Sequence, residues 1–176
     1  MRKLPVNEIP RLSPEEYEKS KKIPLIIVLD NIRSHHNTGA IFRTCDAFGC
    51  EAIYLTGITG KPPHREISKT ALGATETVKW EYFKSIKDCI SEFKNNNYKI
   101  IALEIAEGSI NIKDYTPLPH QKTVLILGHE VYGVNQDIIN MCDVCLEIPQ
   151  FGTKHSLNVS VSSGIAIWEL SNKLRV

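Results

Sequence analysis

The sequence has no long apolar run, few aromatic side chains and almost no net charge. The nearest candidate for a membrane span, Leu25–Leu29, is far shorter than the roughly 20 residues that a transmembrane helix needs. The first 22 residues also lack the apolar stretch of a secretion signal. These absences predict a cytoplasmic protein that has no membrane partner.

The five cysteines are an odd number in a chain without an export signal, so a disulfide framework is not expected. The spacing of Cys142 and Cys145 resembles half of a zinc site, and Cys45 and Cys50 offer the other half. Cys145, however, lies inside an apolar run, and free cysteine commonly packs as a small hydrophobic side chain. The sequence therefore predicts reduced cysteines and no metal ion.

Basic side chains gather at three places, although a net charge of +1 neither requires nor excludes a nucleic-acid partner. The first group precedes the first apolar run and consists of Lys19, Lys21 and Lys22. The second group follows that run and consists of Arg33, His35 and His36. A later loop holds the third group, which consists of Lys61, His64, Arg65 and Lys69. A fold that joined these groups would create a surface for phosphate groups, and an ordinary solvated surface is the alternative.

A chain of 176 residues is long enough for one domain of ordinary size. Residues 1–24 are rich in charge and proline and predict an extension, with a short helix that begins near Ser13 and Pro14. Residues 25–176 predict the folded domain. Within it, continuous apolar runs are typical of strands buried on both faces of a parallel sheet. The runs cover residues 25–29, 52–55, 78–83, 99–103, 123–127 and 144–148.

Helical stretches alternate with these strands, which predicts an α/β fold with a mostly parallel sheet flanked by helices. The clearest helix covers about residues 38–48, with an apolar stripe of Ile41, Cys45 and Phe48. Asn37 is its predicted N-cap and Gly49 its stop. The further predicted helices cover residues 84–95, 135–141 and 157–174.

Helical spacing places particular side chains in two of these helices. Arg43 points away from the apolar stripe of the first helix. In the last helix, Val161, Ile165 and Trp168 share one apolar face.

Polar residues and glycines follow three of the predicted strands, where open α/β sheets bind ligands. Taken singly, each has an ordinary structural explanation: Asn37 caps a helix, Arg43 is a surface arginine, and Gly128 and Gly133 serve turn geometry. The glycine spacing does not match the dinucleotide-binding fingerprint, which disfavours a Rossmann dehydrogenase. The three segments cover residues 30–44, 128–133 and 148–160.

Taken together and in this order, the three segments resemble the motifs of the SpoU/TrmH family of RNA ribose methyltransferases, a branch of the SPOUT superfamily. The first motif, Asn-x-Gly-Ala-x-x-Arg-Thr, is matched by Asn37, Gly39, Ala40, Arg43 and Thr44. The resemblance covers about residues 25–170.

The other two motifs are matched with four departures. In the second, Gly-Asn-Glu-x-x-Gly-Leu, the glycines and Glu130 agree, while His129 and Val134 replace the asparagine and the leucine. The third, Ile-Pro-Met-x-Gly followed by Ser-Leu-Asn-Val-Ser-Val-Ala, agrees except at Gln150 and Ser162. Because the polar positions are kept, the departures bear on cofactor affinity or substrate choice more than on activity.

The resemblance implies an S-adenosylmethionine-dependent enzyme that methylates a ribose 2′-hydroxyl of structured RNA. It also implies a carboxyl-terminal trefoil knot and a homodimer with its sites at the interface. The sequence offers no separate amino-terminal RNA-binding domain, which favours transfer RNA first and ribosomal RNA second, and not DNA. Two alternatives are a non-catalytic RNA-binding member of this fold and a small-molecule enzyme on a flavodoxin-like sheet, which would leave the motifs unexplained.

The resemblance also assigns roles to individual residues. Arg43 would stabilise the developing alkoxide and bind the neighbouring phosphate, because an arginine is almost always protonated. The residues that would position it, the ribose and the phosphate are Asn37, Glu130, Ser156 and Asn158. The cofactor would contact Leu103, Glu104, Gly128, His129, Ile148 and Leu157. RNA would contact Arg33, His36 and Lys154.

Overall fold

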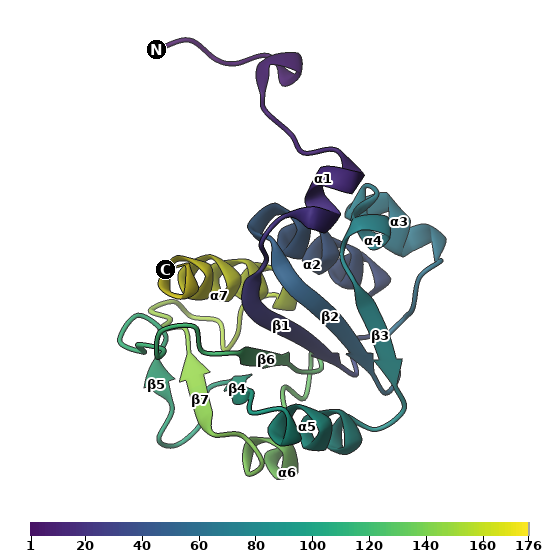
Figure 1. Ribbon diagram of the computed structural model, residues 1–176. Helices are drawn as coiled ribbons and strands as arrows, with labels where there is room; N and C mark the ends of the chain where they lie inside the picture. Colours follow the sequence, from purple (N-terminus) through teal and green to yellow (C-terminus); the bar gives the residue numbers. More distant parts are fainter. Residues whose placement is uncertain (176) are drawn as a thin grey trace.

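A seven-stranded parallel sheet forms the centre of the computed structural model, which describes residues 1–175 (Figure 1). The strand order is β3-β2-β1-β6-β4-β7-β5. The strands are β1 Ile23–Asp30, β2 Cys50–Thr56, β3 Trp80–Phe83, β4 Lys99–Leu103, β5 Ile110–Asn111, β6 Thr123–Leu127 and β7 Val144–Glu147. The six predicted strands and the α/β class are confirmed, and the short edge strand β5 was not predicted. The predicted knot stays a prediction.

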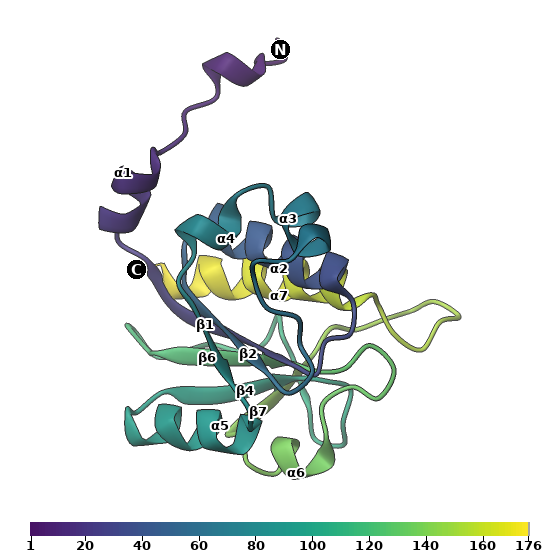
Figure 2. The ribbon, with the colours of Figure 1, turned by 90° about the vertical axis from the view of Figure 1, so that its right-hand side faces the viewer.

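Helices cover both faces of the sheet, as Figure 2 shows. Helices α2, α3, α4 and α7 lie over one face and α5 and α6 over the other, while η1 and α1 extend beyond the sheet. Their bounds are η1 Val6–Glu8, α1 Pro14–Lys19, α2 His35–Phe48, α3 Arg65–Ala71, α4 Ala74–Thr77, α5 Ile86–Asn95, α6 Gln136–Ile139 and α7 Val159–Leu174. No helix among residues 1–175 is long and apolar enough to cross a bilayer.

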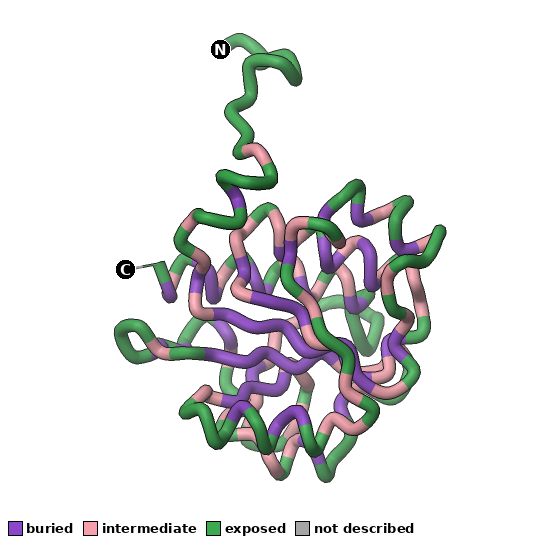
Figure 3. Tube along the Cα trace, turned by 45° about the vertical axis from the view of Figure 1, so that its right-hand side comes forward, coloured by how far each residue is buried: buried purple, intermediate pink, exposed green. Residues whose placement is uncertain are grey.

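The side chains of β1 explain why its sequence is continuously apolar. Leu25, Ile27 and Leu29 join the core beneath α2 and α7, while Ile26 and Val28 join the core against α5 and α6. All five are buried, as the colouring of the central strands in Figure 3 shows. Burial on both faces therefore suits β1 to the interior of the sheet, where it lies between β2 and β6.

The helix ends confirm two predictions and correct one. Ser13 caps α1 with Pro14 as its first residue, and Gly49 ends α2 in the left-handed conformation with φ of 64°. The prediction that Asn37 caps α2 was wrong, because the helix begins earlier. Ser34 is the N-cap, and its Oγ accepts the N–H of Asn37 at 3.3 Å. The side chain of Asn37 is therefore free for other partners.

The apolar stripe of α7 faces solvent. Val161, Ile165 and Trp168 are 50%, 39% and 55% exposed, whereas the residues packed against the sheet include Ser163 and Ala166. These small side chains let the helix lie close to the neighbouring elements. The shared apolar face predicted for α7 is thus present but left uncovered by the rest of residues 1–175.

Gly39 marks the point where α2 and α3 approach most closely. A Cβ at Gly39 would overlap the backbone carbonyl oxygen of Ile67 and the Oγ1 of Thr70, so the motif glycine serves packing. We predict that Gly39→Ala lowers the free energy of unfolding by about 1–3 kcal/mol, as overpacking does. The control is Gly164→Ala in α7, where a Cβ meets nothing within 4 Å.

The control variant is expected to be unchanged or more stable by about 0.5–1 kcal/mol, because alanine favours a helix more than glycine. Urea denaturation of both variants measures the difference. Equal stability of Gly39→Ala and the parent chain would contradict the packing role of Gly39.

Candidate active site

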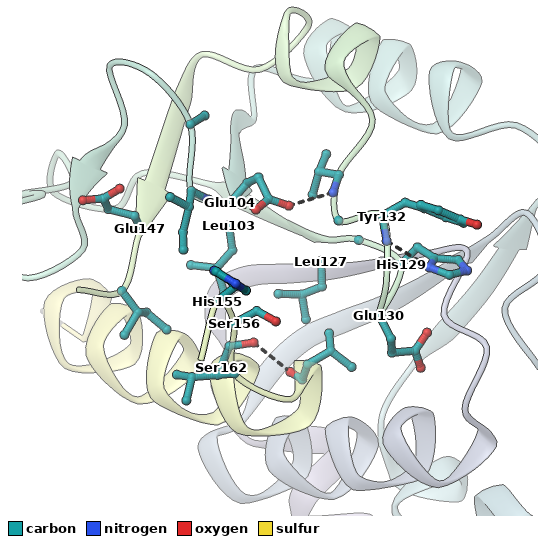
Figure 4. A pocket seen from close by; sticks show the side chains of 18 of the residues that line it. Leu103, Glu104, Leu127, His129, Glu130, Tyr132, Glu147, His155, Ser156 and Ser162 are labelled. Carbon is teal, nitrogen blue, oxygen red and sulfur yellow. Dashed lines mark hydrogen bonds between the residues drawn. The ribbon is translucent and has the colours of Figure 1, made fainter. Parts of the chain in front are cut away.

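A cavity of about 540 Å³ lies at the carboxyl ends of β4, β6 and β7 (Figure 4). All six residues predicted to contact the cofactor line it: Leu103, Glu104, Gly128, His129, Ile148 and Leu157. Glu130 and Ser156, which were predicted to position the reactants, also lie on its wall. The structure adds Tyr132 and Glu147, which no sequence signal marks beyond their places after or near the end of a strand.

The loop after β6 closes on itself. The N–H of His129 donates to the carbonyl of Gly133 at 3.1 Å, and the N–H of Gly133 donates back at 2.8 Å. Gly133 has φ of +65°, and a Cβ on Gly128 would overlap the backbone of Gly133. The two motif glycines therefore allow a compact loop that presents Glu130 at its tip.

The side chain of Glu104, at the end of β4, anchors this loop. Its Oε2 accepts the N–H of Val134 at 2.9 Å, and its Oε1 accepts the N–H of Ile105 at 2.8 Å. A Cβ on Gly133 would overlap the Glu104 carboxylate. Glu104 thus ties the cavity wall at β4 to the wall at β6, a role of its side chain that the sequence did not reveal.

Glu130 binds the amino-terminal end of α2. Its carboxylate accepts the backbone N–H groups of Arg33 and Ser34, both at 2.9 Å, and the Nδ2 of Asn37 at 3.1 Å. Burial raises the pKa of Glu130, but these hydrogen bonds together outweigh it and leave the pKa below its ordinary value. Glu130 is therefore a carboxylate that accepts hydrogen bonds at neutral pH.

Asn158, from the third motif, contacts one of the residues that Glu130 joins at the start of α2. Its Oδ1 accepts the N–H of Ser160 at 2.9 Å and so caps α7, while its Nδ2 donates to the Oδ1 of Asn37 at 3.3 Å. Asn37 in turn donates to Glu130. One residue from each motif segment thus joins a continuous polar network.

The side chains of the remaining predicted site residues do not join that network. Arg43 lies exposed on α2 and makes no hydrogen bond or ion pair with another side chain in the described part of the chain. Ser156 and Lys154 are exposed on the loop that precedes α7. Arg33 and His36 are exposed near the start of α2, and the Nε2 of His36 contacts the carboxylate of Glu66.

Two of the three predicted groups of basic residues come together, while Lys19, Lys21 and Lys22 lie before the opposite end of β1. The ring of His35 stacks on that of His64 with centroids 3.8 Å apart, which holds the loop after β2 against the start of α2. Hydrogen bonds from Lys69 and His36 lower the pKa of Glu66 to about 2. Glu66 is the one carboxylate in this basic surface, defined as Arg33, His35, His36, Lys61, His64, Arg65, Glu66 and Lys69. The surface has three more permanent positive than negative charges, against +1 for the whole chain.

The alternative metal site gains no geometric support. Residues 1–175 contain no group of three or more histidine, cysteine, aspartate or glutamate side chains placed to hold a metal ion. Cys45 and Cys50 are buried, and the thiol of Cys145 donates to the carbonyl of Glu104 at 3.4 Å.

The parallel sheet, the cavity at its carboxyl edge and the three linked motifs define a methyltransferase of the SPOUT class. The model of the SpoU rRNA Methylase family matches residues 24–168, and the chain belongs to that family. The chain is 36% identical to the tRNA (guanosine(18)-2'-O)-methyltransferase of Aquifex aeolicus, over 88% of this chain and 72% of that protein.

Two solved structures share the fold. The TrmH/SpoU tRNA modifying enzyme of A. aeolicus has a TM-score of 0.80 and 33% identity, with 91% of this chain and 80% of that chain covered. An AdoMet-bound rRNA methyltransferase of Sinorhizobium meliloti has a TM-score of 0.82 and 26% identity, with 94% of this chain and 62% of that chain covered. S-adenosylmethionine, abbreviated AdoMet, is the cofactor that the second of these structures holds.

The residues of the cavity fit that cofactor chemically. Leu103, Leu127 and Ile148 supply apolar wall for a neutral purine, as ligand pockets commonly do. Glu104 and Glu147 supply negative charge, which suits the positive sulfonium and ammonium groups.

We predict that Glu130→Gln lowers the free energy of unfolding by about 1–3 kcal/mol at neutral pH, because hydrogen bonds to a charged acceptor are lost. A lowered pKa in the folded state means that the carboxylate stabilises the fold above the ordinary glutamate pKa of 4.5. The difference between parent and variant should therefore shrink as the pH falls below that value. Urea denaturation at several pH values measures it, with the exposed Glu81→Gln as control.

A difference that stays constant into the acid range would contradict the proposed ionised state of Glu130. Glu81→Gln is expected to match the parent chain throughout, because surface substitutions away from such contacts change stability little.

Proposed function

We propose that the chain transfers the methyl group of S-adenosylmethionine to a ribose 2′-hydroxyl of structured RNA in the cytoplasm, with transfer RNA as the first candidate. The observation that carries the proposal is the network that joins Glu130, Asn37 and Asn158 beside the cofactor cavity. The basic surface next to this network suits a phosphate backbone. The A. aeolicus relative named above is a tRNA methyltransferase, which supports the choice of substrate.

The bound cofactor supplies an electrophilic methyl group, so the protein must orient a weak nucleophile and assist the loss of its proton. In this proposal Asn37, Ser156 and Asn158 hold the ribose and its phosphate. Glu130 fixes the orientation of Asn37 by accepting from its Nδ2. Arg43 stabilises the developing alkoxide as a permanent cation.

Ribosomal RNA is the second candidate substrate, because the S. meliloti neighbour is an rRNA methyltransferase. Incubation with labelled S-adenosylmethionine and either transfer RNA or ribosomal RNA, followed by mapping of 2′-O-methylated positions, separates the two. No methylation of either RNA, with the cofactor bound, would leave a non-catalytic RNA-binding protein as the better description.

We predict that Arg43→Ala reduces methyl transfer by at least about 100-fold, because one charged stabiliser of the transition state is lost. The fold and the affinity for S-adenosylhomocysteine should stay unchanged, since Arg43 is exposed and does not line the cavity. Calorimetric titration and a labelled-methyl assay measure the two quantities, with the exposed Arg11→Ala as control. Unfolding of Arg43→Ala would instead identify a structural arginine.

We also propose that the chain acts as a homodimer whose interface includes α7. Val161, Ile165 and Trp168 form an exposed apolar stripe, and the Trp168 ring meets Phe48 of α2 edge to face with centroids 5.7 Å apart. Arg43 lies on the same helix as Phe48, and its side chain has no hydrogen-bond or ion-pair partner among residues 1–175. A second copy that covered the stripe would bury the apolar side chains and could bring new partners to Arg43.

We predict that Trp168→Glu yields a monomer by analytical ultracentrifugation, because a buried unpaired carboxylate opposes association. Methyl transfer should fall with it, while the monomer stays folded. Leu118→Glu, at a 72% exposed position outside α7, is the matched control and should remain dimeric. A parent chain that sediments as a monomer with full activity would contradict the dimer.

A further inference from the structure

His129 departs from the asparagine usual in the second motif, and its contacts show what it does instead. Its Nδ1 accepts the backbone N–H groups of Val131 at 2.9 Å and Tyr132 at 3.3 Å. The ring also lies against that of Tyr132, with centroids 4.8 Å apart (Figure 4). An asparagine makes the same kind of turn, because its side-chain oxygen accepts the N–H two residues ahead.

A second histidine of this protein also accepts a backbone N–H with its ring nitrogen, in a position where asparagine is common. His64, the N-cap of α3, accepts the N–H of Glu66 with its Nδ1 at 3.2 Å, where asparagine, aspartate or serine commonly serves. An unprotonated imidazole nitrogen is therefore a sufficient acceptor for such turns in this fold. It follows that His129 preserves the geometry of the motif although the residue type has changed.

The position of this turn links His129 to Glu130. The backbone of His129 is fixed by its two hydrogen bonds with Gly133, and its side chain fixes the two residues that follow Glu130. Glu130 is thus held on both sides while its carboxylate reaches Arg33, Ser34 and Asn37. Free rotation of this turn would move the carboxylate away from the start of α2.

We propose that His129 is a positioning residue for methyl transfer, which holds Glu130 in place by accepting two backbone N–H groups with an unprotonated Nδ1. This inference rests on the proposed function, since it concerns the same site. It gives the enzyme an acid sensitivity that an asparagine at this position would not give.

The acid sensitivity follows from the chemistry of imidazole. Histidine is the side chain that commonly gains its charge between about pH 5 and 8, and a protonated ring has two donors and no acceptor. Protonated Nδ1 would face the N–H groups of Val131 and Tyr132 and open the turn. Among the ionisable groups of this loop, Tyr132 lies against the His129 ring and Glu130 follows His129 in the chain. The loop also contacts two ionisable residues from neighbouring elements: Glu104, after β4, accepts the N–H of Val134, and Arg33, before α2, donates its N–H to Glu130.

The test compares His129→Asn and His129→Ala with the parent enzyme over about pH 5.5 to 8.5. At the alkaline end, kcat of His129→Asn should exceed that of His129→Ala by at least about tenfold, because in the alanine variant both N–H groups lose their acceptor. Towards acid pH the parent should lose activity relative to His129→Asn. Superimposable pH profiles for these two, or full activity of His129→Ala, would overturn the proposal.

A second measurement separates this test from that of the proposed function. Hydrogen exchange of the Val131 and Tyr132 amides, corrected for the intrinsic pH dependence, reports the turn without RNA or cofactor. Protection of both amides should fall at acid pH in the parent and persist in His129→Asn. This result would stand even if neither RNA were methylated, whereas equal protection in both proteins across the pH range would refute the role of His129.

Discussion

The carboxylate of Glu130 at the start of α2 is the interaction on which the site depends. The first N–H groups of a helix have no partner within the helix, and its amino-terminal end carries partial positive charge. A carboxylate from the loop after β6 meets both needs at once. Because β1 and β6 are neighbours in the sheet, with Leu29 paired to Leu127, their following loops emerge side by side. The sheet order therefore makes this contact possible, and the contact fixes Asn37.

Much of the fold could be predicted because a strand that is buried on both faces has a continuous apolar sequence. β1 and β6 are continuous apolar runs, and each is buried along most of its length. β5 was missed because two residues at the sheet edge, Ile110 and Asn111, have no pattern to detect. α3 was missed because seven residues with two buried side chains show no clear periodicity.

The site could be predicted in part, and mainly through the family motifs. Spacing alone assigned Asn37 to a helix cap, and the structure shows that a serine three residues earlier has that role. The side-chain role of Glu104 had no signal, because a single glutamate at a strand end looks like any surface residue. The four departures from the motifs, His129, Val134, Gln150 and Ser162, all line the cavity. Asn37 and Asn158, which link the motif segments, are unchanged.

The sheet order also bears on how the chain folds during synthesis. β1 has β2 on one side, which follows soon after it, but its other edge pairs with β6, nearly one hundred residues later. An unpaired strand edge is a template for association with other chains. While the ribosome makes the intervening segment, β1 therefore exposes its backbone groups on that side, and pairing across such sequence separation is slow. A strand in the interior of the folded sheet is thus one that needs protection from aggregation in the nascent chain.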